Sequence, residues 1–106
     1  MALSDQALEA LFQAQENVSV ELSPGFRIVG KIQNKTDHGN SVNSLLIKLE
    51  SAPGGMLSIS RYKDPQGHIF YSGHLLKLHE PDGMIIVEND HGSFLIKTQQ
   101  RFLVAE

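Results

Sequence analysis

Histidine and serine are the residue types in this chain that could do chemistry. His68 and His74 share the parity of one strand, but the other histidines fall in loops and no pair has the spacing of a zinc motif. Ser58, Ser60 and Ser72 could approach a histidine across neighbouring strands, although serine is common on sheet faces. The sequence holds no nucleophile elbow, no phosphate-binding loop and no cysteine. We therefore expect a non-catalytic protein without a metal site or cofactor.

A polar patch interrupts an apolar face near the C-terminus. Counting by twos along one face leads from Ile96 through Thr98 and Gln100 to Phe102. The patch consists of Lys97, Thr98, Gln99 and Gln100. It is the first candidate binding site, and the alternative interpretation is an ordinary solvated link between two strands.

A second candidate site lies in the polar stretch 34–41, which has the composition of a loop. Its side chains that could contact a ligand are Asp37, His38 and Asn40, next to Lys35 and Thr36. An ordinary mobile loop is the alternative interpretation of this segment.

The first element expected is a short amphipathic helix over residues 4–15. Ser4 is a suitable N-cap, and Leu8, Leu11 and Phe12 recur at helical spacing. A helix of this length is marginal alone, so its apolar stripe must pack on another element.

From Val18 the apolar period changes to two, which predicts strands over residues 18–105. Turn signals recur at 23–25, 52–55, 64–67 and 80–83, so about seven or eight strands follow one another as hairpins. Gly30 inside a strand indicates a bend or a close backbone approach. The predicted fold class is mainly β, an N-terminal helix followed by a small, strongly bent antiparallel β-barrel that forms one domain over residues 1–106.

The turn Asp90-His91-Gly92 closes the last predicted hairpin, because glycine tolerates the positive φ that a short hairpin needs. This turn places Ile85 opposite Ile96 and Val87 opposite Phe94, and we expect these four residues to form an inward apolar face.

A second set of apolar residues is expected to face outward from the strands. Its members are Leu46, Leu75, Ile86 and Leu95. Either the helix and surface scatter account for them, or they form a subunit interface. A simple turn at Asp64 places His74 on the core face near Leu57, which favours a buried, hydrogen-bonded histidine.

Composition describes an ordinary soluble domain, with 106 residues, 41% of them hydrophobic and 20% charged. The net charge of -3 means that nucleic-acid binding would require a local basic face. The lysines Lys31, Lys48, Lys77 and Lys97 could form such a stripe, or merely protect the sheet from aggregation. The start of the chain lacks a basic segment and no apolar run reaches the ~20 residues of a membrane helix, so we expect a cytoplasmic protein without membrane contact.

Two stretches resemble the Sm-like family of RNA-binding barrels, which includes the bacterial Hfq branch. The first is a helix followed by Val18-x-Val20-x-Leu22, Gly25 and Gly30-x-Ile32, and the second is the stretch 84–104. Thr98 departs from the family, which usually has glycine or histidine after the basic residue. The middle of the chain, 51–83, is longer than the family pattern and would be an extra β-hairpin. A second register is also open, with Gly73-x-Leu75 as the glycine motif and His79 and Asp82 in place of the loop at 34–41.

The resemblance implies an assembly and a function. Sm-like proteins form rings by pairing strands of neighbouring subunits, and they bind single-stranded RNA around the pore. By this likeness Lys97 would meet phosphate, Gln99 or Gln100 would bond a base edge, and the loop with Asp37 and His38 would contact bases. The first hypothesis is therefore a non-catalytic, homo-oligomeric ring that binds single-stranded RNA. The alternative is a protein-interaction or structural adaptor on a small β-barrel, with outward apolar residues as its contact face.

Overall fold

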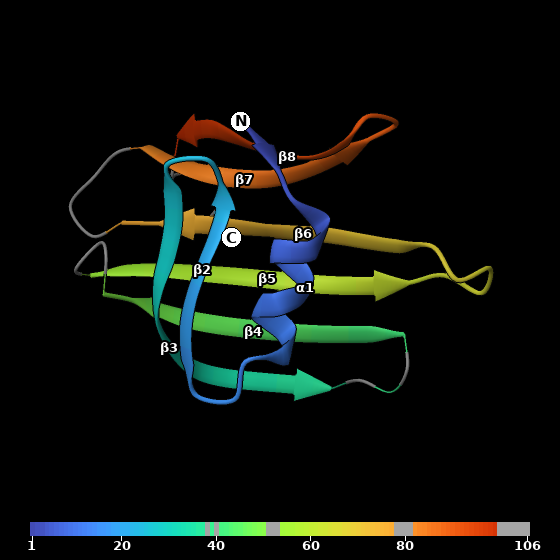
Figure 1. The fold of residues 1–106 in the computed structure, drawn as a ribbon, viewed down its shortest axis with the longest axis horizontal. Helices are drawn as coiled ribbons and strands as arrows, with labels where there is room; N and C mark the ends of the chain where they lie inside the picture. The colour runs from blue at the N-terminus through green and yellow to red at the C-terminus, as the bar shows by residue number, and fades with distance from the viewer. Residues whose placement is uncertain (38, 40, 51–53, 78–81, 100–106) are drawn as a thin grey trace.

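The computed structural model describes all residues except 38, 40, 51–53, 78–81 and 100–106. It confirms the predicted fold class, mainly β with one short N-terminal helix: the strands form a nearly closed, barrel-like antiparallel sheet of eight in the order β1-β8-β7-β6-β5-β4-β3-β2, and seven of them follow the helix (Figure 1). The elements are β1 (Ala2–Leu3), α1 (Asp5–Gln13), β2 (Asn17–Ser23), β3 (Phe26–Asp37), β4 (Val42–Leu49), β5 (Gly55–Lys63), β6 (Ile69–Leu76), β7 (Asp82–Asn89) and β8 (Gly92–Gln99).

The longest strand, β3, belongs to both layers of the molecule. It has twelve residues, and its pairing with β4 shifts between Ile32 and Asn34. A bulge of this kind bends a strand and increases its twist. The first part of β3 therefore pairs with β2 in a layer that crosses in front of β4, β5 and β6, while its second part continues beside β4 (Figure 1).

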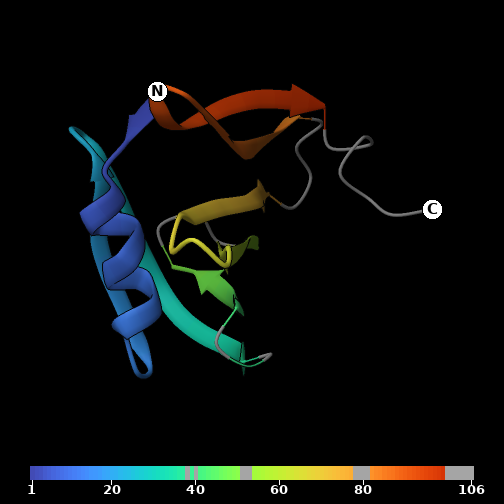
Figure 2. The ribbon, with the colours of Figure 1, turned by 90° about the vertical axis from the view of Figure 1, so that its right-hand side faces the viewer.

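Helix α1 completes the layer that β2 begins, and the two lie side by side over the inner face of the sheet (Figures 1 and 2). The Ser4 hydroxyl accepts a hydrogen bond from Ala7 N at 3.3 Å, so the predicted N-cap is confirmed. The helix ends at Gln13 because Ala14 already has extended backbone angles. Among the described residues, no helix is long and apolar enough to cross a membrane.

The N-terminal segment brings the two ends of the sheet together. Ala2 and Leu3 pair with Phe94 and Ser93 of β8. The next residue, Ser4, donates its backbone N–H to the carbonyl of Leu22 in β2 at 2.9 Å. The two residues of β1 therefore bridge the edge strands β8 and β2, which makes the sheet nearly closed.

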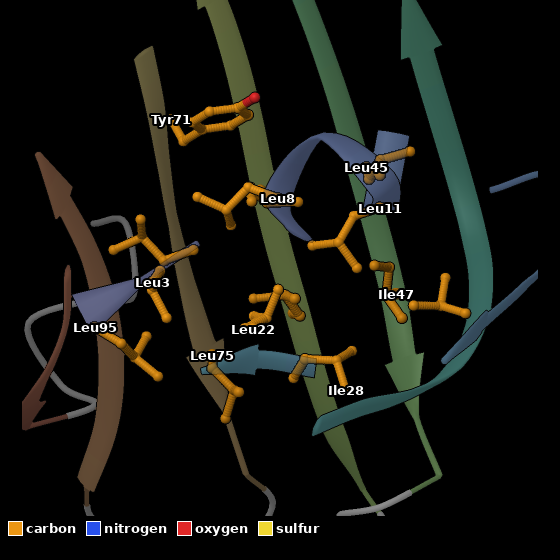
Figure 3. Close-up of a cluster of buried hydrophobic side chains, with 14 of the residues drawn as sticks. Leu3, Leu8, Leu11, Leu22, Ile28, Leu45, Ile47, Tyr71, Leu75 and Leu95 are labelled. Atoms are coloured by element: carbon orange, nitrogen blue, oxygen red, sulfur yellow. The ribbon is translucent and has the colours of Figure 1, made fainter. Parts of the chain in front are cut away.

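Buried side chains from the helix and from every strand form one core (Figure 3). Leu8 and Leu11 of α1 are fully buried between Tyr71, Leu45 and Ile28 (Figure 3). The close backbone approach predicted at Gly30 is confirmed, because a Cβ there would lie 2.2 Å from the carbonyl oxygen of Lys48.

The register predicted for β7 and β8 is confirmed, but the face predicted to point inward is wrong. Ile85 pairs with Ile96 and Val87 with Phe94, as the turn implied. These four residues nevertheless face away from the core, and Ile96 is 43% exposed. Of the residues expected to face outward, only Leu46 does so, because Leu75, Ile86 and Leu95 are at most 4% exposed and belong to the core.

The position predicted for His74 is also wrong. His74 pairs with Ser58 on the outer face of β5 and β6, and Leu75 takes the place opposite Leu57. The reason lies in the turn after β5. Gly67 adopts a φ of 91° and the Asp64 N–H bonds the carbonyl of His68, so the turn has one residue more than the simple type I turn assumed. One added residue moves the whole strand pairing by one position and reverses the faces.

Candidate functional site

The face of the sheet that points away from α1 and the core is called the outer face here. Alternation along each strand from β3 to β8 assigns its residues, because buried positions mark the opposite side. From Lys31 of β3 onward, the outer-face residues with described side chains are Lys31, Asn34, Thr36, Val42, Ser44, Leu46, Lys48, Met56, Ser58, Ser60, Tyr62, Phe70, Ser72, His74, Leu76, Ile85, Val87, Asn89, Phe94, Ile96 and Thr98.

Charge is distributed unevenly over this face. Among the outer-face residues just named there is no aspartate or glutamate, whereas Lys31 and Lys48 are both exposed. The two lysines pair directly across β3 and β4 and line a hollow of about 260 Å³ together with Leu49 and Glu50. Like charges directly opposite one another in a sheet are destabilising, and an anion between them would remove that cost.

Two aromatic side chains stand opposite each other at one end of the outer face. Tyr62 of β5 pairs with Phe70 of β6, and they are 41% and 42% exposed. The His68 ring lies edge-on to Phe70, with the ring centroids 6.4 Å apart. A pair of exposed aromatic rings can stack on flat ring systems such as nucleobases.

A row of serine hydroxyls crosses the same strands next to the aromatic pair. Ser44, Ser60 and Ser72 are aligned in register across β4, β5 and β6, and the Oγ atoms of Ser44 and Ser60 are 3.0 Å apart. Beside this row lies a depression of about 200 Å³, lined by Asn34, Thr36, Ser44, Leu45, Leu46 and Ser58. Hydroxyl and amide groups there can both donate and accept hydrogen bonds.

The residues predicted from the sequence as a site are not brought together by the structure. Lys97 and Thr98 lie near the end of β8, where Lys97 shares the parity of buried Leu95 and Thr98 shares the outer face. Asp37 lies at the end of β3, and its carboxylate accepts a hydrogen bond from the Asn43 amide at 3.1 Å. Four strands, β4 to β7, separate β3 from β8 in the sheet.

Other residues of the two predicted sites lack a described position. Gln99 belongs to β8, but its side chain is outside the described part of the structure. Gln100, His38 and Asn40 also lie outside the described residues. The predicted RNA contacts of all these residues therefore stay predictions.

A cleft of about 340 Å³ opens between α1 and the β5–β6 hairpin, on the side of the sheet opposite the outer face. Three of its polar groups bond one another: Glu9 Oε2 accepts from Arg61 Nε at 2.8 Å and from the Tyr71 hydroxyl at 2.5 Å. Burial, and next the hydrogen bond to Glu9, raise the pKa of the Tyr71 hydroxyl above its ordinary value. Because this network joins the helix to the sheet, we interpret the cleft as a structural feature.

The sequence reasoning missed the aromatic pair and the serine row. A signal for both existed in the turn Asp64-Pro65-Gln66-Gly67, since the glycine at its end is typical of a hairpin with one additional residue. That register places Tyr62 opposite Phe70 and Ser60 opposite Ser72.

Among the described residues, no group of three or more histidine, aspartate or glutamate side chains is placed to hold a metal ion. Comparisons of the chain with protein-family models, with curated proteins and with solved structures find no match. A proposal for the function of the chain therefore rests on the geometry of its own residues.

Proposed function

We propose that the protein is a non-catalytic binding domain for single-stranded RNA, and that the outer face of β4, β5 and β6 is its binding surface. The observation that carries the proposal is the exposed cross-strand pair of Tyr62 and Phe70 on a face without described acidic side chains. Proteins that bind single strands stack successive bases on exposed aromatic rings and hold the backbone with cations.

The local charge of the surface supports an anionic partner although the chain as a whole has a net charge of -3. Acidic residues lie in the helix (Asp5, Glu9), in β2 (Glu21) and in the turns (Asp64, Asp90), and Glu50 lines the hollow beside Lys31 and Lys48. A phosphate backbone that follows the outer face would pass Lys48 and Lys31 at the end of the face away from the aromatic pair.

Self-association into a ring, which the family resemblance implies, is a separate proposal. A ring needs a strand edge that a second copy can complete. Residues 93–95 of β8 already bond the N-terminal segment of the same chain, with Leu95 N donating to Met1 O at 2.8 Å. A ring would therefore use the later part of β8, from Ile96 to Gln99, and the outer-face site would be complete in each copy.

The experiment that tests RNA binding measures fluorescence anisotropy with labelled single-stranded RNA of about ten nucleotides. We expect Phe70→Ala and Tyr62→Ala each to weaken binding about five- to a hundredfold, since stacking contributes about 1–3 kcal/mol per base. Ile96→Ala is the matched control, because Ile96 is 43% exposed against 42% for Phe70 but lies on β8. Equal affinity of Phe70→Ala and the original protein would contradict the proposed surface.

Salt dependence gives a second measure of the same contact. With one or two phosphates neutralised by Lys31 and Lys48, the logarithm of the association constant should fall with the logarithm of salt concentration at a slope of about -0.7 to -1.4. Lys48→Ala should make the slope shallower by about 0.7. An unchanged slope in Lys48→Ala would show that Lys48 does not contact phosphate.

The second candidate function is a protein-interaction adaptor. It is favoured by one observation, the outward apolar cluster of Ile85, Val87, Phe94 and Ile96 on β7 and β8. Contiguous apolar residues on a surface are typical of protein contacts. The Ile96→Ala variant separates the two functions. It should leave RNA affinity unchanged if the outer face of β4 to β6 binds RNA. If the chain binds no RNA at low salt, the adaptor function is preferred.

A further inference from the structure

We propose that the serine row of Ser44, Ser60 and Ser72 distinguishes RNA from DNA by hydrogen bonding to the ribose 2′-hydroxyl. This inference rests on the proposed RNA-binding function and adds to it the feature of the ligand that the surface recognises. The ligand class is then single-stranded RNA in particular, not single-stranded nucleic acid in general.

The position of the row relative to the aromatic pair supports a contact with the sugar. Ser60 precedes Tyr62 by two residues and Ser72 follows Phe70 by two, so both serines lie on the same face and on the same side of the aromatic pair. Two residues of a strand span about 7 Å. That is the scale of one nucleotide, so a base stacked on Phe70 or Tyr62 brings its ribose over Ser60 and Ser72.

The hydroxyl groups of the row can donate a hydrogen bond to a 2′-hydroxyl and can accept one from it. The Oγ atoms of Ser44 and Ser60 are 3.0 Å apart, and either one can donate to the other. The hydroxyl that accepts in this pair keeps its own proton for a ligand, and Ser72 is exposed next to Ser60. A 2′-hydroxyl is both donor and acceptor, whereas deoxyribose offers neither group at that position.

The contribution of such contacts is moderate because Ser60 is half-buried and Ser72 is exposed. Water competes for exposed hydroxyls, and a neutral hydrogen bond in such a place changes affinity by about three- to tenfold. We therefore expect a preference of this size for RNA over DNA and not a complete rejection of DNA.

The test compares four strands of equal length with the same uracil bases: uridine RNA, 2′-deoxyuridine DNA, 2′-fluoro RNA and 2′-O-methyl RNA. The 2′-fluoro strand keeps the RNA-like sugar pucker but cannot donate a hydrogen bond, so it separates pucker from hydroxyl recognition. We expect uridine RNA to bind about three- to tenfold tighter than the other three. In the double variant Ser60→Ala, Ser72→Ala this difference should vanish while the affinity for 2′-deoxyuridine DNA stays the same.

Ser19→Ala is the control variant, because Ser19 is an exposed strand serine on β2 whose hydroxyl accepts from Arg27 at 3.1 Å. It should keep the preference of the original protein. A 2′-fluoro strand that binds as tightly as RNA, or a double variant that keeps the preference, overturns the serine inference and leaves RNA binding intact. If the original protein binds none of the four strands at low salt, the proposed function itself fails.

Discussion

One carboxylate oxygen, Glu9 Oε2, holds two groups of the sheet to the helix. It accepts from Arg61 Nε at 2.8 Å and from the Tyr71 hydroxyl, and no described buried polar side-chain atom lacks a partner. Solvent weakens the contribution of the Glu9–Arg61 ion pair to stability, because the Glu9 side chain is 34% accessible. Tyr71 is the more deeply placed partner, with an exposure of 5%.

The raised pKa of Tyr71 predicts a loss of stability at alkaline pH. Its pKa is above the ordinary value of about 10 in the folded chain, so the stabilisation is fully present below about pH 10 and is lost as the pH rises beyond it. In a Tyr62→Phe background, tyrosinate absorbance reports Tyr71 alone and should appear only above about pH 10, together with unfolding. Tyr71→Phe should remove this contribution to alkaline unfolding. Titration of Tyr71 at about pH 10 without unfolding would contradict the prediction.

Gly73 is a position where one added methyl group should destabilise the fold. A Cβ there would lie 2.3 Å from the Ser58 carbonyl oxygen and 2.9 Å from the Ile59 Cα, both of them backbone atoms of β5. We expect Gly73→Ala to lower the free energy of unfolding by about 2–3 kcal/mol in urea denaturation. Ser72→Ala, the adjacent exposed position, should change it by no more than about 0.5 kcal/mol.

At the scale of elements, Lys35 fastens the end of α1 to β3. Its Nζ donates to the carbonyl oxygens of Phe12 at 3.0 Å and Ala14 at 3.1 Å, where the helix leaves carbonyls without helical partners. We expect Lys35→Ala to lower the free energy of unfolding by about 1 kcal/mol. Lys48→Ala, on the outer face, is the charge-matched control, and equal losses in both variants would contradict the capping role.

The sequence predicted the elements and one hairpin register well, because turn chemistry is local. The two-residue turn before Gly92, which has a φ of 122°, sets Ile85 opposite Ile96 as expected. The turn before β6 is one residue longer than predicted, since the aspartate and glycine at its ends fit both a simple turn and one with a bulge. That single residue decides whether His74 or Leu75 faces the core.

The inward face of β7 and β8 could not be predicted because both faces of this hairpin are apolar. Ile86 and Leu95 are inward only because their neighbour across the sheet is the inward part of β6, where Gly73 pairs with Ile86. Pairing between strands that lie far apart in the chain therefore fixes the face. The alternation of apolar residues within one strand does not show which face points to the core.

For the whole molecule, the candidate site depends on how the meander is arranged. The stretch 51–83, which the family resemblance left as an extra hairpin, contains β5 and β6, and these two strands lie in the middle of the sheet and carry the aromatic pair. The candidate residues in β3 and β8 lie on either side of them, separated by four strands. A site that three neighbouring strands assemble has no contiguous motif, and the sequence pattern favours the polar stretches 37–40 and 97–100 instead.

Whether the chain also forms a ring can be tested with one proline. Leu95 N points to the N-terminal segment, so the N–H of Lys97 points the same way, out of the β7–β8 ladder. Lys97→Pro therefore removes an outward donor and leaves the fold intact. A ring predicts a native mass of several chains for the original protein and of one chain for Lys97→Pro.

The control for this experiment is Thr98→Pro, which removes a hydrogen bond to β7 and should destabilise the chain itself. A single-chain mass for the original protein at concentrations that bind RNA would exclude the ring. RNA affinity would not depend on that result, because Tyr62 and Phe70 belong to one chain.

The long strand β3 has a consequence for how the molecule unfolds. Because its first residues hydrogen-bond β2 and its later residues hydrogen-bond β4, neither layer can detach without breaking the other's ladder. Amide protons in both layers should therefore exchange with solvent through one shared global opening, and the domain should melt as a single cooperative unit.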